Sequence, residues 1–460
     1  MAQEHPEVQD AEPVGRKDLS ARQAAAILVG VWLLLFAEFL WVTYEYHHGI
    51  GIWGNDAQEY YAWIRSLSLD GDVDFENEYT DYDYSNTVAN WLLNTRTPKG
   101  LHTNATGIGC SLCWSPFFGL ACLISWVTAL PVDGFNPVFQ FLVPFGSILY
   151  GGVAICLIYR ICRLRFDRWA SVLGTAGVFL GTTLTFLFSH LPMLSHLPAV
   201  AVTAAFLLIA LKTAEHRSLR HWIGLGALLA LVTMIRLPMA ILAIVFPIQS
   251  VLRILRDARA EWPGCCRQEM LGWLVAATTA FVLFLPQLVA WKALFGSFLA
   301  SYVEPTKIFD WSCPNFFSAL FSWNHGVVVW TPIVGLALVG LVASAVSRLS
   351  AQSLPLLGYT LALCYVVGCC AWWNFPEVYG NRGFSEASPA FAFGLAFLWH
   401  KWRKIALALT VLAIVQNHLL IWAYQNDYVQ KVTGYGDILN GYIQIITHVF
   451  GKILRLAGLG

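Results

Sequence analysis

The chain has 460 residues, of which 57% are hydrophobic and 12% are charged, about half of the roughly 25% charged residues found in soluble proteins. This composition excludes an ordinary soluble protein and predicts an integral membrane protein. Lys and Arg together number 28, as do Asp and Glu. The chain therefore lacks the basic excess that favours nucleic acid, and we expect no nucleic-acid partner.

The N-terminal part predicts a cytoplasmic tail followed by a first transmembrane helix. Residues 1–23 are polar and mixed in charge, and an apolar run covers about residues 24–44. The run is longer than the roughly 7–15 apolar residues of a signal peptide and ends in bulky aromatic residues, so we expect it to remain uncleaved. Arg16, Lys17 and Arg22 precede it and place the tail on the cytoplasmic side by the positive-inside rule.

The first outer loop carries many acids soon after this helix. Apolar and aromatic residues between positions 60 and 69 fit one side of a helix that lies along the membrane interface. Asp56 would lie at the start of that helix, where it either accepts a proton from an acceptor hydroxyl or caps the helix; the local sequence favours neither role. The alternating acids at 70–78 lack the register of a calcium loop, which favours a solvated acidic turn.

The basic residues between the later apolar runs indicate which helix ends are cytoplasmic. Hydropathy alone predicts that residues 110–130 and 138–159 both cross the membrane, which would place the arginine cluster at 160–168 outside. The conflict disappears if residues 110–130 lie in or dip into the outer face without crossing. We therefore expect residues 45–137 to form one outer loop that contains a membrane-parallel or re-entrant helical segment.

The expected fold is an all-α polytopic membrane protein with about eleven transmembrane helices. The membrane domain covers residues 24–424, and residues 425–460 form an outward-facing tail that is partly amphipathic. With this topology, every later basic cluster lies on the cytoplasmic side. After the first helix, the expected spans are near residues 138–159, 169–189, 196–212, 221–235, 238–252, 270–291, 327–347, 353–373, 384–400 and 405–424.

Ionisable residues lie where several of these spans reach the outer face, and such positions favour a functional role. His196 has two alternatives of equal weight, a functional role or a hydrogen bond inside the helix bundle. Arg236 lies between two short helices, where an arginine is costly without a partner, so an anionic partner is favoured. Arg382 either binds a phosphate or forms a structural ion pair with Glu386, one turn further along.

Five stretches, taken in chain order, resemble the GT-C superfamily of membrane glycosyltransferases. Within the bacterial branch of this superfamily, the chain is similar to dolichyl-phosphate-mannose mannosyltransferases and to the aminoarabinose transferase of lipid A. The order of the stretches and their common outer side carry the resemblance more than any single motif does. The stretches are Asp56-Ala-Gln-Glu-Tyr-Tyr with residues 69–79, Trp114-Ser-Pro-Phe-Phe118, Ser195-His196, residues 286–292 with Phe295-Gly-Ser297, and residues 321–332 with 380–386.

The resemblance implies an inverting transfer of a hexose or pentose from a polyprenyl-phosphate donor to a glycan, lipid or protein acceptor, with Asp56 as the base. It implies a multi-pass protein of a bacterial cytoplasmic membrane, with its N-terminus inside and its active site outside. No metal-binding motif accompanies Asp56, so a divalent metal is not implied. By position, the candidate substrate-binding residues are His196, Arg236, Lys292, Asn381, Arg382 and Glu386.

A transporter or flippase of lipid-linked sugars is the alternative function. Transporters often contain inverted repeats and polar residues at the membrane midplane. This sequence has no visible internal repeat, and its acids gather outside the expected spans. These two features favour the enzyme.

Overall fold

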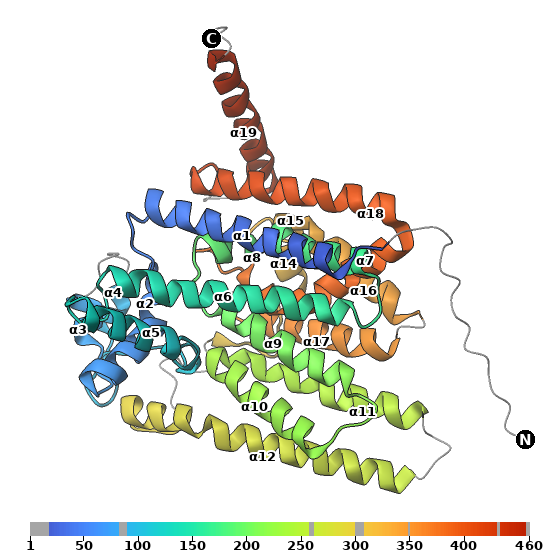
Figure 1. The fold of residues 1–460 in the computed structure, drawn as a ribbon, viewed down its shortest axis with the longest axis horizontal. Coiled ribbons are helices and arrows are strands. Elements are labelled where there is room, and N and C mark those ends of the chain that lie inside the picture. Colours follow the sequence, from blue (N-terminus) through green and yellow to red (C-terminus); the bar gives the residue numbers. More distant parts are fainter. Residues whose placement is uncertain are drawn as a thin grey trace, which may run out of the picture.

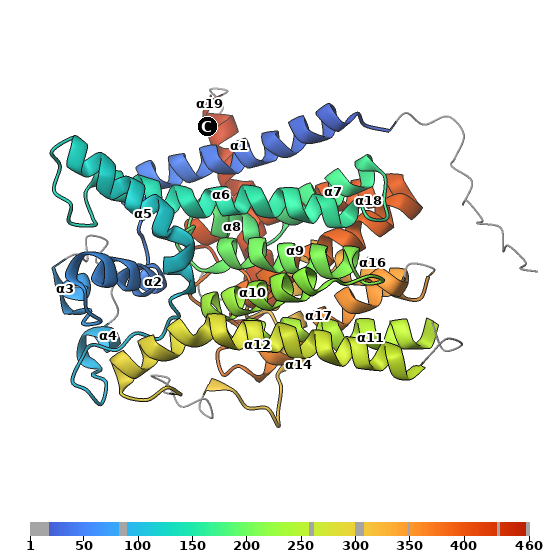
Figure 2. The same cartoon turned by 60° about the horizontal axis from the view of Figure 1, so that its bottom comes forward.

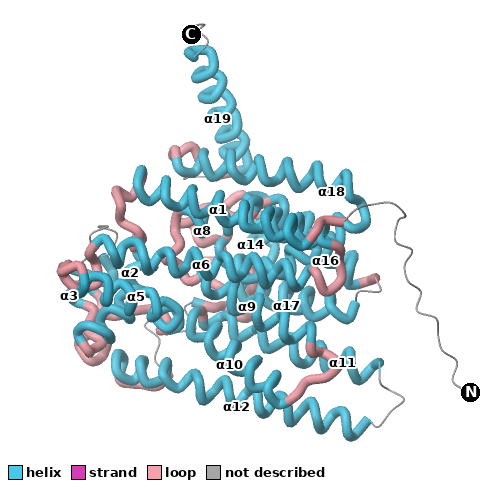
Figure 3. The backbone as a smooth tube through the Cα atoms, in the orientation of Figure 1, coloured by secondary structure: helices cyan, strands magenta, loops and turns pink. Residues whose placement is uncertain are grey.

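The computed structural model of the chain is built mainly of helices. It describes residues 18–81, 90–256, 262–299, 308–347, 350–429 and 433–456. Figure 3 shows helices joined by loops, and the extended pairing within those ranges consists of two isolated bridges, Arg96 with His102 and Phe309 with Cys370. The longer helices are α1 (Ala21–Glu45), α2 (Asn55–Arg65), α5 (Gly109–Val127), α6 (Pro137–Cys162), α7 (Arg168–Gly181), α9 (His196–Lys212), α10 (Leu219–Ile235), α11 (Val245–Arg256), α12 (Trp262–Phe295), α16 (Pro332–Ala345), α17 (Ser350–Cys369), α18 (Ser388–Gln425) and α19 (Tyr435–Leu456). The shorter elements are η1 (Ser66–Asp70), α3 (Glu76–Thr80), α4 (Asn90–Asn94), α8 (Thr183–Ser189), η2 (Leu237–Ile244), α14 (Phe316–Phe321), α15 (Val327–Trp330) and η3 (Arg382–Ala387).

Long apolar helices lie side by side and form the body of the molecule, and α19 projects from it (Figure 1). Within the described ranges, seven helices are long and apolar enough to cross a membrane, or eight if the bent pair α7 and α8 is one span. The apolar helices α9, α10 and α16 are shorter. Each expected span coincides with one or more helices, while the number eleven remains a prediction.

The helix α18 consists of two antiparallel runs. Its backbone is non-helical at Trp402, with φ −133° and ψ 56°. Leu395 and Thr410 lie on opposite sides of this break, yet both would contact a Cβ placed on Gly177 of α7, at 3.4 and 3.2 Å. The chain therefore folds back at Trp402, between the two spans that the sequence predicts for this region.

The helix α5 accompanies only the first half of α6. Trp114, near the start of α5, donates a hydrogen bond to Ser147 of α6 at 2.8 Å, and Ser125, near its end, accepts one from Asn136, just before α6 begins. In Figures 1 and 2, α5 lies with α2, α3 and α4 at one end of the bundle. Length and composition alone would allow α5 to cross a membrane, but its position is that of a segment that enters from one end without running the length of the bundle.

Close packing of α16 against α18 holds the start of α18, the segment that directly follows η3. A Cβ on Gly340 of α16 would lie 2.1 Å from the carbonyl oxygen of Gly394 in α18. The two backbones can approach this closely only because both positions lack a side chain, as is common where membrane helices meet. The start of α18 is therefore held firmly, and η3, which directly precedes it, carries Arg382 and Glu386.

Candidate active site

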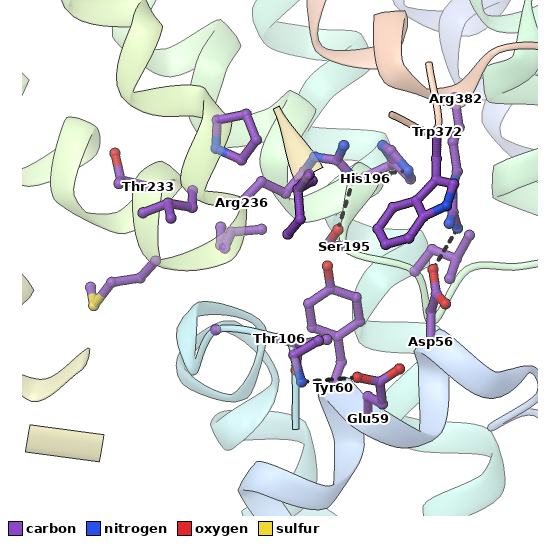
Figure 4. Close-up of a pocket in the computed structure, with 18 of the residues that line it drawn as sticks. Asp56, Glu59, Tyr60, Thr106, Ser195, His196, Thr233, Arg236, Trp372 and Arg382 are labelled. Carbon is purple, nitrogen blue, oxygen red and sulfur yellow. Dashed lines mark hydrogen bonds and ion pairs between the residues drawn. The ribbon is translucent and has the colours of Figure 1, made fainter. Parts of the chain in front are cut away.

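A cavity of about 1040 Å³ lies where the first outer loop meets the ends of α10, α12 and α17. Three kinds of surface line it. Polar residues come from α2 and from residues 104–107, apolar residues from positions 233–241 and from α12, and aromatic residues mainly from positions 309–311 and 365–375. Figure 4 shows side chains from these separate parts of the chain pointing toward one another.

The helix α12 forms one side of this cavity and is itself exposed on its other side. The α12 residues that line the cavity are Phe284, Gln287, Trp291 and Phe295. The exposed apolar residues of the same part of α12 are Phe281, Val282, Leu285 and Val289, which retain between 40 and 61% of their accessible surface. Such a continuous exposed apolar face is typical of a helix in contact with lipid.

Asp56 lies in the first turn of α2 and faces Arg382 across the cavity (Figure 4). The helix begins after Gly54, whose φ of 102° favours glycine. Gly54 is the cap residue, so the alternative that Asp56 caps the helix is wrong. Oδ2 of Asp56 instead lies 2.6 Å from Nη1 of Arg382. Burial would raise the pKa of Asp56, but the charge and hydrogen bond of Arg382 outweigh burial and lower that pKa.

Glu59 is a second carboxyl in the cavity and is not among the site residues predicted from sequence. It follows Asp56 by about one helical turn, lines the cavity and is 3% exposed. Its Oε1 accepts a hydrogen bond from Asn55 at 3.2 Å, and its Oε2 accepts one from the backbone N–H of Ala105 at 3.1 Å. Burial and the nearby charge of Asp56 raise the pKa of Glu59 to about 8. The spacing of three residues, which places both acids on one face of a helix, is the signal that could have identified it.

Arg236 is held by a polar group that three separate elements supply. Nη1 of Arg236 lies 3.1 Å from Nε2 of His196, at the start of α9, and Nε lies 3.3 Å from Oε1 of Glu386 in η3. Nδ1 of His196 lies 2.9 Å from the same Oε1. His196 and Glu386 are 1% and 0% exposed, and Arg236 keeps 17% of its side chain exposed. His196 and Arg236 line the cavity, whereas Glu386 does not. The structure therefore brings together three of the residues that the sequence predicts.

The backbone that leads to Arg236 is fixed by the first outer loop. A Cβ on Gly107 would lie 2.1 Å from the carbonyl oxygen of Met234, and one on Gly109 would lie 2.2 Å from the next backbone nitrogen of α10. The backbone N–H of Ile108, between these two glycines, donates a hydrogen bond to Oε1 of Gln287 on α12 at 2.9 Å. This contact holds the outer loop, α10 and α12 together, so that Arg236 leaves the end of α10 from a defined position.

Two other predicted site residues lie outside the lining of the cavity. Nζ of Lys292 donates a hydrogen bond to the carbonyl oxygen of Gly296 at 2.7 Å, at the end of α12. Asn381 is 1% exposed, caps η3 by accepting from the N–H of Gly383, and donates to the carbonyl oxygen of Trp373 at 2.8 Å. Both side chains are therefore engaged with the local backbone, and their predicted contact with substrate gains no support from this placement.

The alternative ion pair between Arg382 and Glu386 is wrong. Arg382 pairs with Asp56 of the first outer loop, and Glu386 pairs with Arg236. Both residues belong to η3, but that short helix directs Arg382 into the cavity and leaves Glu386 behind Arg236, outside the cavity lining. Glu386 thus contacts another protein side chain, and its predicted substrate contact stays a prediction.

The acidic turn of the first outer loop is tied together by its own arginine. Nη1 of Arg65 lies 2.6 Å from Asp70 and 2.7 Å from Glu78. Glu78 is 1% exposed, and burial raises its pKa to about 7 despite the arginine. The expectation of a fully solvated turn is therefore wrong for Glu78, which is part of the buried structure of the loop.

Within the described residues, one group of side chains has the spacing of a metal site, and it lies outside the cavity lining. The ligand atoms of Asp74, Glu76 and His102 lie within 4.8 Å of one another. Nδ1 of His102 also contacts the guanidinium of Arg96. A positive group on the only nitrogen ligand of the set disfavours a cation there.

The fold is similar to the folds of two solved membrane proteins. One is the archaeal oligosaccharyltransferase AglB from Archaeoglobus fulgidus in complex with an inhibitory peptide and a dolichol-phosphate, with TM-score 0.53 and 12% identity over 92% of this chain and 56% of AglB. The other is ArnT from Cupriavidus metallidurans bound to undecaprenyl phosphate, with TM-score 0.50 and 13% identity over 93% of this chain and 76% of ArnT. The chain thus spans little more than half the length of AglB.

A family model matches part of the chain in sequence. Residues 121–291 match the model of the dolichyl-phosphate-mannose-protein mannosyltransferases, a segment that includes His196 and Arg236. No curated protein matches the chain. The identities to AglB and ArnT are low, so these likenesses concern the fold alone. The comparisons thus give this chain a helical fold similar to those of AglB and ArnT and, over residues 121–291, a match to the mannosyltransferase family model.

Proposed function

We propose that this protein transfers a sugar from a polyprenyl-phosphate donor to an acceptor hydroxyl at the outer face of the membrane, with inversion at the anomeric carbon. The observation that carries the proposal is a single cavity lined by the carboxylate of Asp56 and by two arginines, Arg236 and Arg382. AglB was solved with a dolichol-phosphate and ArnT with undecaprenyl phosphate, which supports a donor of this class for the present chain.

In the proposed reaction, the acceptor oxygen forms a bond to the anomeric carbon while the bond from that carbon to the phosphate oxygen breaks. The bonding electrons leave with the phosphate, and the acceptor proton passes to Asp56, which acts as general base. A guanidinium binds phosphate through two parallel hydrogen bonds and stabilises the negative charge that develops on it. Because the acceptor attacks from the side opposite to the phosphate, the anomeric configuration inverts.

The ion pair between Asp56 and Arg382 links the donor to the base. Without a donor, Arg382 holds Asp56 at 2.6 Å and lowers its pKa, which makes the carboxylate a weaker base. A donor phosphate that takes hydrogen bonds from Arg382 reduces this effect and frees Asp56 to turn toward the acceptor. The base is therefore strongest when the donor is in place, and the ion pair protects the site from premature proton transfer.

The proposed activity is tested with the purified chain in membrane vesicles that contain polyprenyl phosphates carrying different radiolabelled sugars, together with an extract of cell-envelope acceptors. We expect the label of one donor to move from the lipid fraction to an acceptor, and we expect Asp56→Asn to stop this movement. The matched control is Glu76→Gln, which removes an exposed acid of the same loop and should transfer at the wild-type rate.

Two results would contradict the proposal. One is that no labelled donor loses its sugar in the presence of the wild-type chain. The other is that Asp56→Asn, folded as judged by its unfolding temperature, retains substantial transfer. A label that moves across the bilayer but stays on its polyprenyl phosphate would indicate the transporter or flippase.

A further inference from the structure

His196 lies between a buried carboxylate and the arginine that faces the cavity. We propose that His196 is a positioning residue that prevents Arg236 from closing into a two-point ion pair with Glu386, so that the guanidinium stays available to an anion in the cavity. The inference rests on the proposed function for the identity of that anion, which is the donor phosphate. It assigns to His196 a role different from the substrate contact predicted from sequence.

The direction of each hydrogen bond in this group follows from the chemistry of its members. A carboxylate only accepts hydrogen bonds and a guanidinium only donates them. Nδ1 of His196 therefore carries the proton that it donates to Oε1 of Glu386 at 2.9 Å, and Nε2 accepts from Nη1 of Arg236 at 3.1 Å. Both ring nitrogens are engaged with protein side chains, so the imidazole acts on the cavity through Arg236.

The contact between Arg236 and Glu386 is incomplete, and the position of His196 explains why. An arginine and a carboxylate favour two parallel hydrogen bonds. Here Nε of Arg236 lies 3.3 Å from Oε1 but without the alignment of a hydrogen bond. Oε2 of Glu386 is buried and has no hydrogen-bond partner within the part of the chain that the structure describes. His196 occupies Oε1 and holds Nη1 at 3.1 Å, with Oγ of Ser195 as a second, longer contact of Nη1 at 3.3 Å. The shorter contact with His196 keeps a second N–H of Arg236 away from Oε2.

Removal of the imidazole would change which partner Arg236 prefers. A buried carboxylate oxygen without a hydrogen bond is unfavourable, and the guanidinium of Arg236 already lies 3.3 Å from the other oxygen of the same carboxylate. Without His196, the side chain of Arg236 would turn toward Glu386 and satisfy both carboxylate oxygens. The same N–H groups would then be lost to a phosphate in the cavity. The bound phosphate and Glu386 thus compete for one guanidinium, and His196 biases the competition toward the phosphate.

This competition predicts a rescue that a purely structural histidine would not produce. The experiment measures the dissociation constant of undecaprenyl phosphate for the full chain in lipid nanodiscs, together with the unfolding temperature of each variant. We expect His196→Ala to weaken binding roughly 10- to 100-fold, the effect of losing a hydrogen bond to a charged group. Adding Glu386→Gln to His196→Ala should restore most of this loss, because the glutamine no longer attracts Arg236 with a full charge.

Two further variants complete the test. His196→Gln should bind close to the wild type, since its amide can still donate to Glu386 and accept from Arg236. The matched control is His216→Ala, which removes an exposed histidine beyond the other end of α9 and should leave binding unchanged.

The inference would be overturned if the double variant bound as weakly as His196→Ala, because His196 would then contact the phosphate directly or merely fill space. It would also be overturned if His196→Gln were no better than His196→Ala, or if His196→Ala lowered the unfolding temperature without changing binding. The measurement requires neither sugar nor acceptor. A wild-type chain that binds undecaprenyl phosphate and shows the rescue, but transfers no sugar, would therefore contradict the proposed reaction and support the role of His196.

Discussion

Two arginines line the same cavity with nearly equal exposure, 16% for Arg382 and 17% for Arg236, but their counter-ions differ. Asp56, the partner of Arg382, keeps 30% of its side chain exposed, whereas Glu386, the partner of Arg236, is fully buried. A substrate can therefore reach both members of the first ion pair and only the arginine of the second. The burial of the counter-ion thus separates a carboxylate that can take part in chemistry from one that only holds its arginine.

The largest expected effect comes from the exposed pair. Asp56→Asn should lower the rate of sugar transfer by about 10²- to 10⁴-fold, the usual contribution of a general base. Glu386→Gln should have a much smaller effect on the rate, because Glu386 does not line the cavity. Transfer rates at saturating donor and acceptor compare the two variants. Equal losses in both would remove the distinction between the two carboxylates.

The same substitution should also strengthen donor binding. Asp56 and the donor phosphate compete for Arg382 in the proposed reaction, so Asp56→Asn should bind undecaprenyl phosphate about two- to fivefold more tightly, the range for a partly exposed ion pair. Equilibrium binding to the inactive variant measures this gain. Weaker binding would mean that Asp56 supports the donor site and does not compete with it.

Removal of each arginine should separate stability from binding. Arg236→Gln leaves the buried carboxylate of Glu386 without its cation and should lower the free energy of unfolding by about 3 kcal/mol. Arg382→Gln leaves a partly exposed carboxylate and should lower it by less than about 1 kcal/mol. Both variants should weaken binding of undecaprenyl phosphate. Chemical unfolding in detergent measures the free energies, and similar losses for the two variants would contradict the comparison.

The pH dependence of stability should reveal Glu59, which lies beside the exposed pair. Its pKa of about 8 in the folded chain is above its ordinary value of 4.5. The stability that Glu59 contributes is therefore complete below about pH 4.5 and is lost as the pH rises through about 8. Glu59→Gln should flatten the decline of the unfolding temperature between these values. An unchanged profile would mean that Glu59 does not carry this proton.

The last experiment tests the membrane topology, namely whether α5 crosses the membrane. This decides whether the cavity with Arg236 and Arg382 lies on the same side as the first outer loop. Single cysteines replace Asp133, just after α5, and Arg160, near the end of α6, and an impermeant thiol reagent is added to intact cells. If α5 does not cross, we expect labelling at position 133 and none at position 160. Labelling at position 160 and none at position 133 would mean that α5 crosses, and labelling of both positions would mean that α6 does not; either result would refute the topology.

The sequence predicts which ionisable side chains line the cavity better than it predicts which of them meet. Asp56, Arg236 and Arg382 stand out because ionisable groups at the ends of apolar runs are costly, and all three line the cavity. Which carboxylate pairs with each arginine depends on how η3 is oriented between α17 and α18. This orientation has no signature in the local sequence. The short distance along the chain from Arg382 to Glu386 therefore suggests an ion pair that the fold does not form.

Charge and hydropathy were most informative for the membrane topology. The arginines after α6 predict that α5 does not cross the membrane, whereas its length and composition alone would make it a span, and this prediction awaits the labelling experiment. The close contact of Gly107 and Gly109 with α10 could not be predicted, because a glycine in a loop is equally common in an open turn. That contact positions Arg236 and so helps to determine the site.

The side of α12 that points away from the cavity is exposed and apolar, and this affects how the proposed lipid-linked donor would arrive. One helix separates the cavity from the surrounding lipid, since Phe284 and Trp291 line the cavity while Phe281 and Val289 are exposed. If the proposed polyprenyl-phosphate donor enters beside α12, its hydrocarbon tail can stay in the bilayer while its phosphate reaches Arg236. Transfer of a single five-carbon isoprene unit into water would cost about 4 kcal/mol, so lateral entry spares a long polyprenyl chain most of a prohibitive solvation barrier.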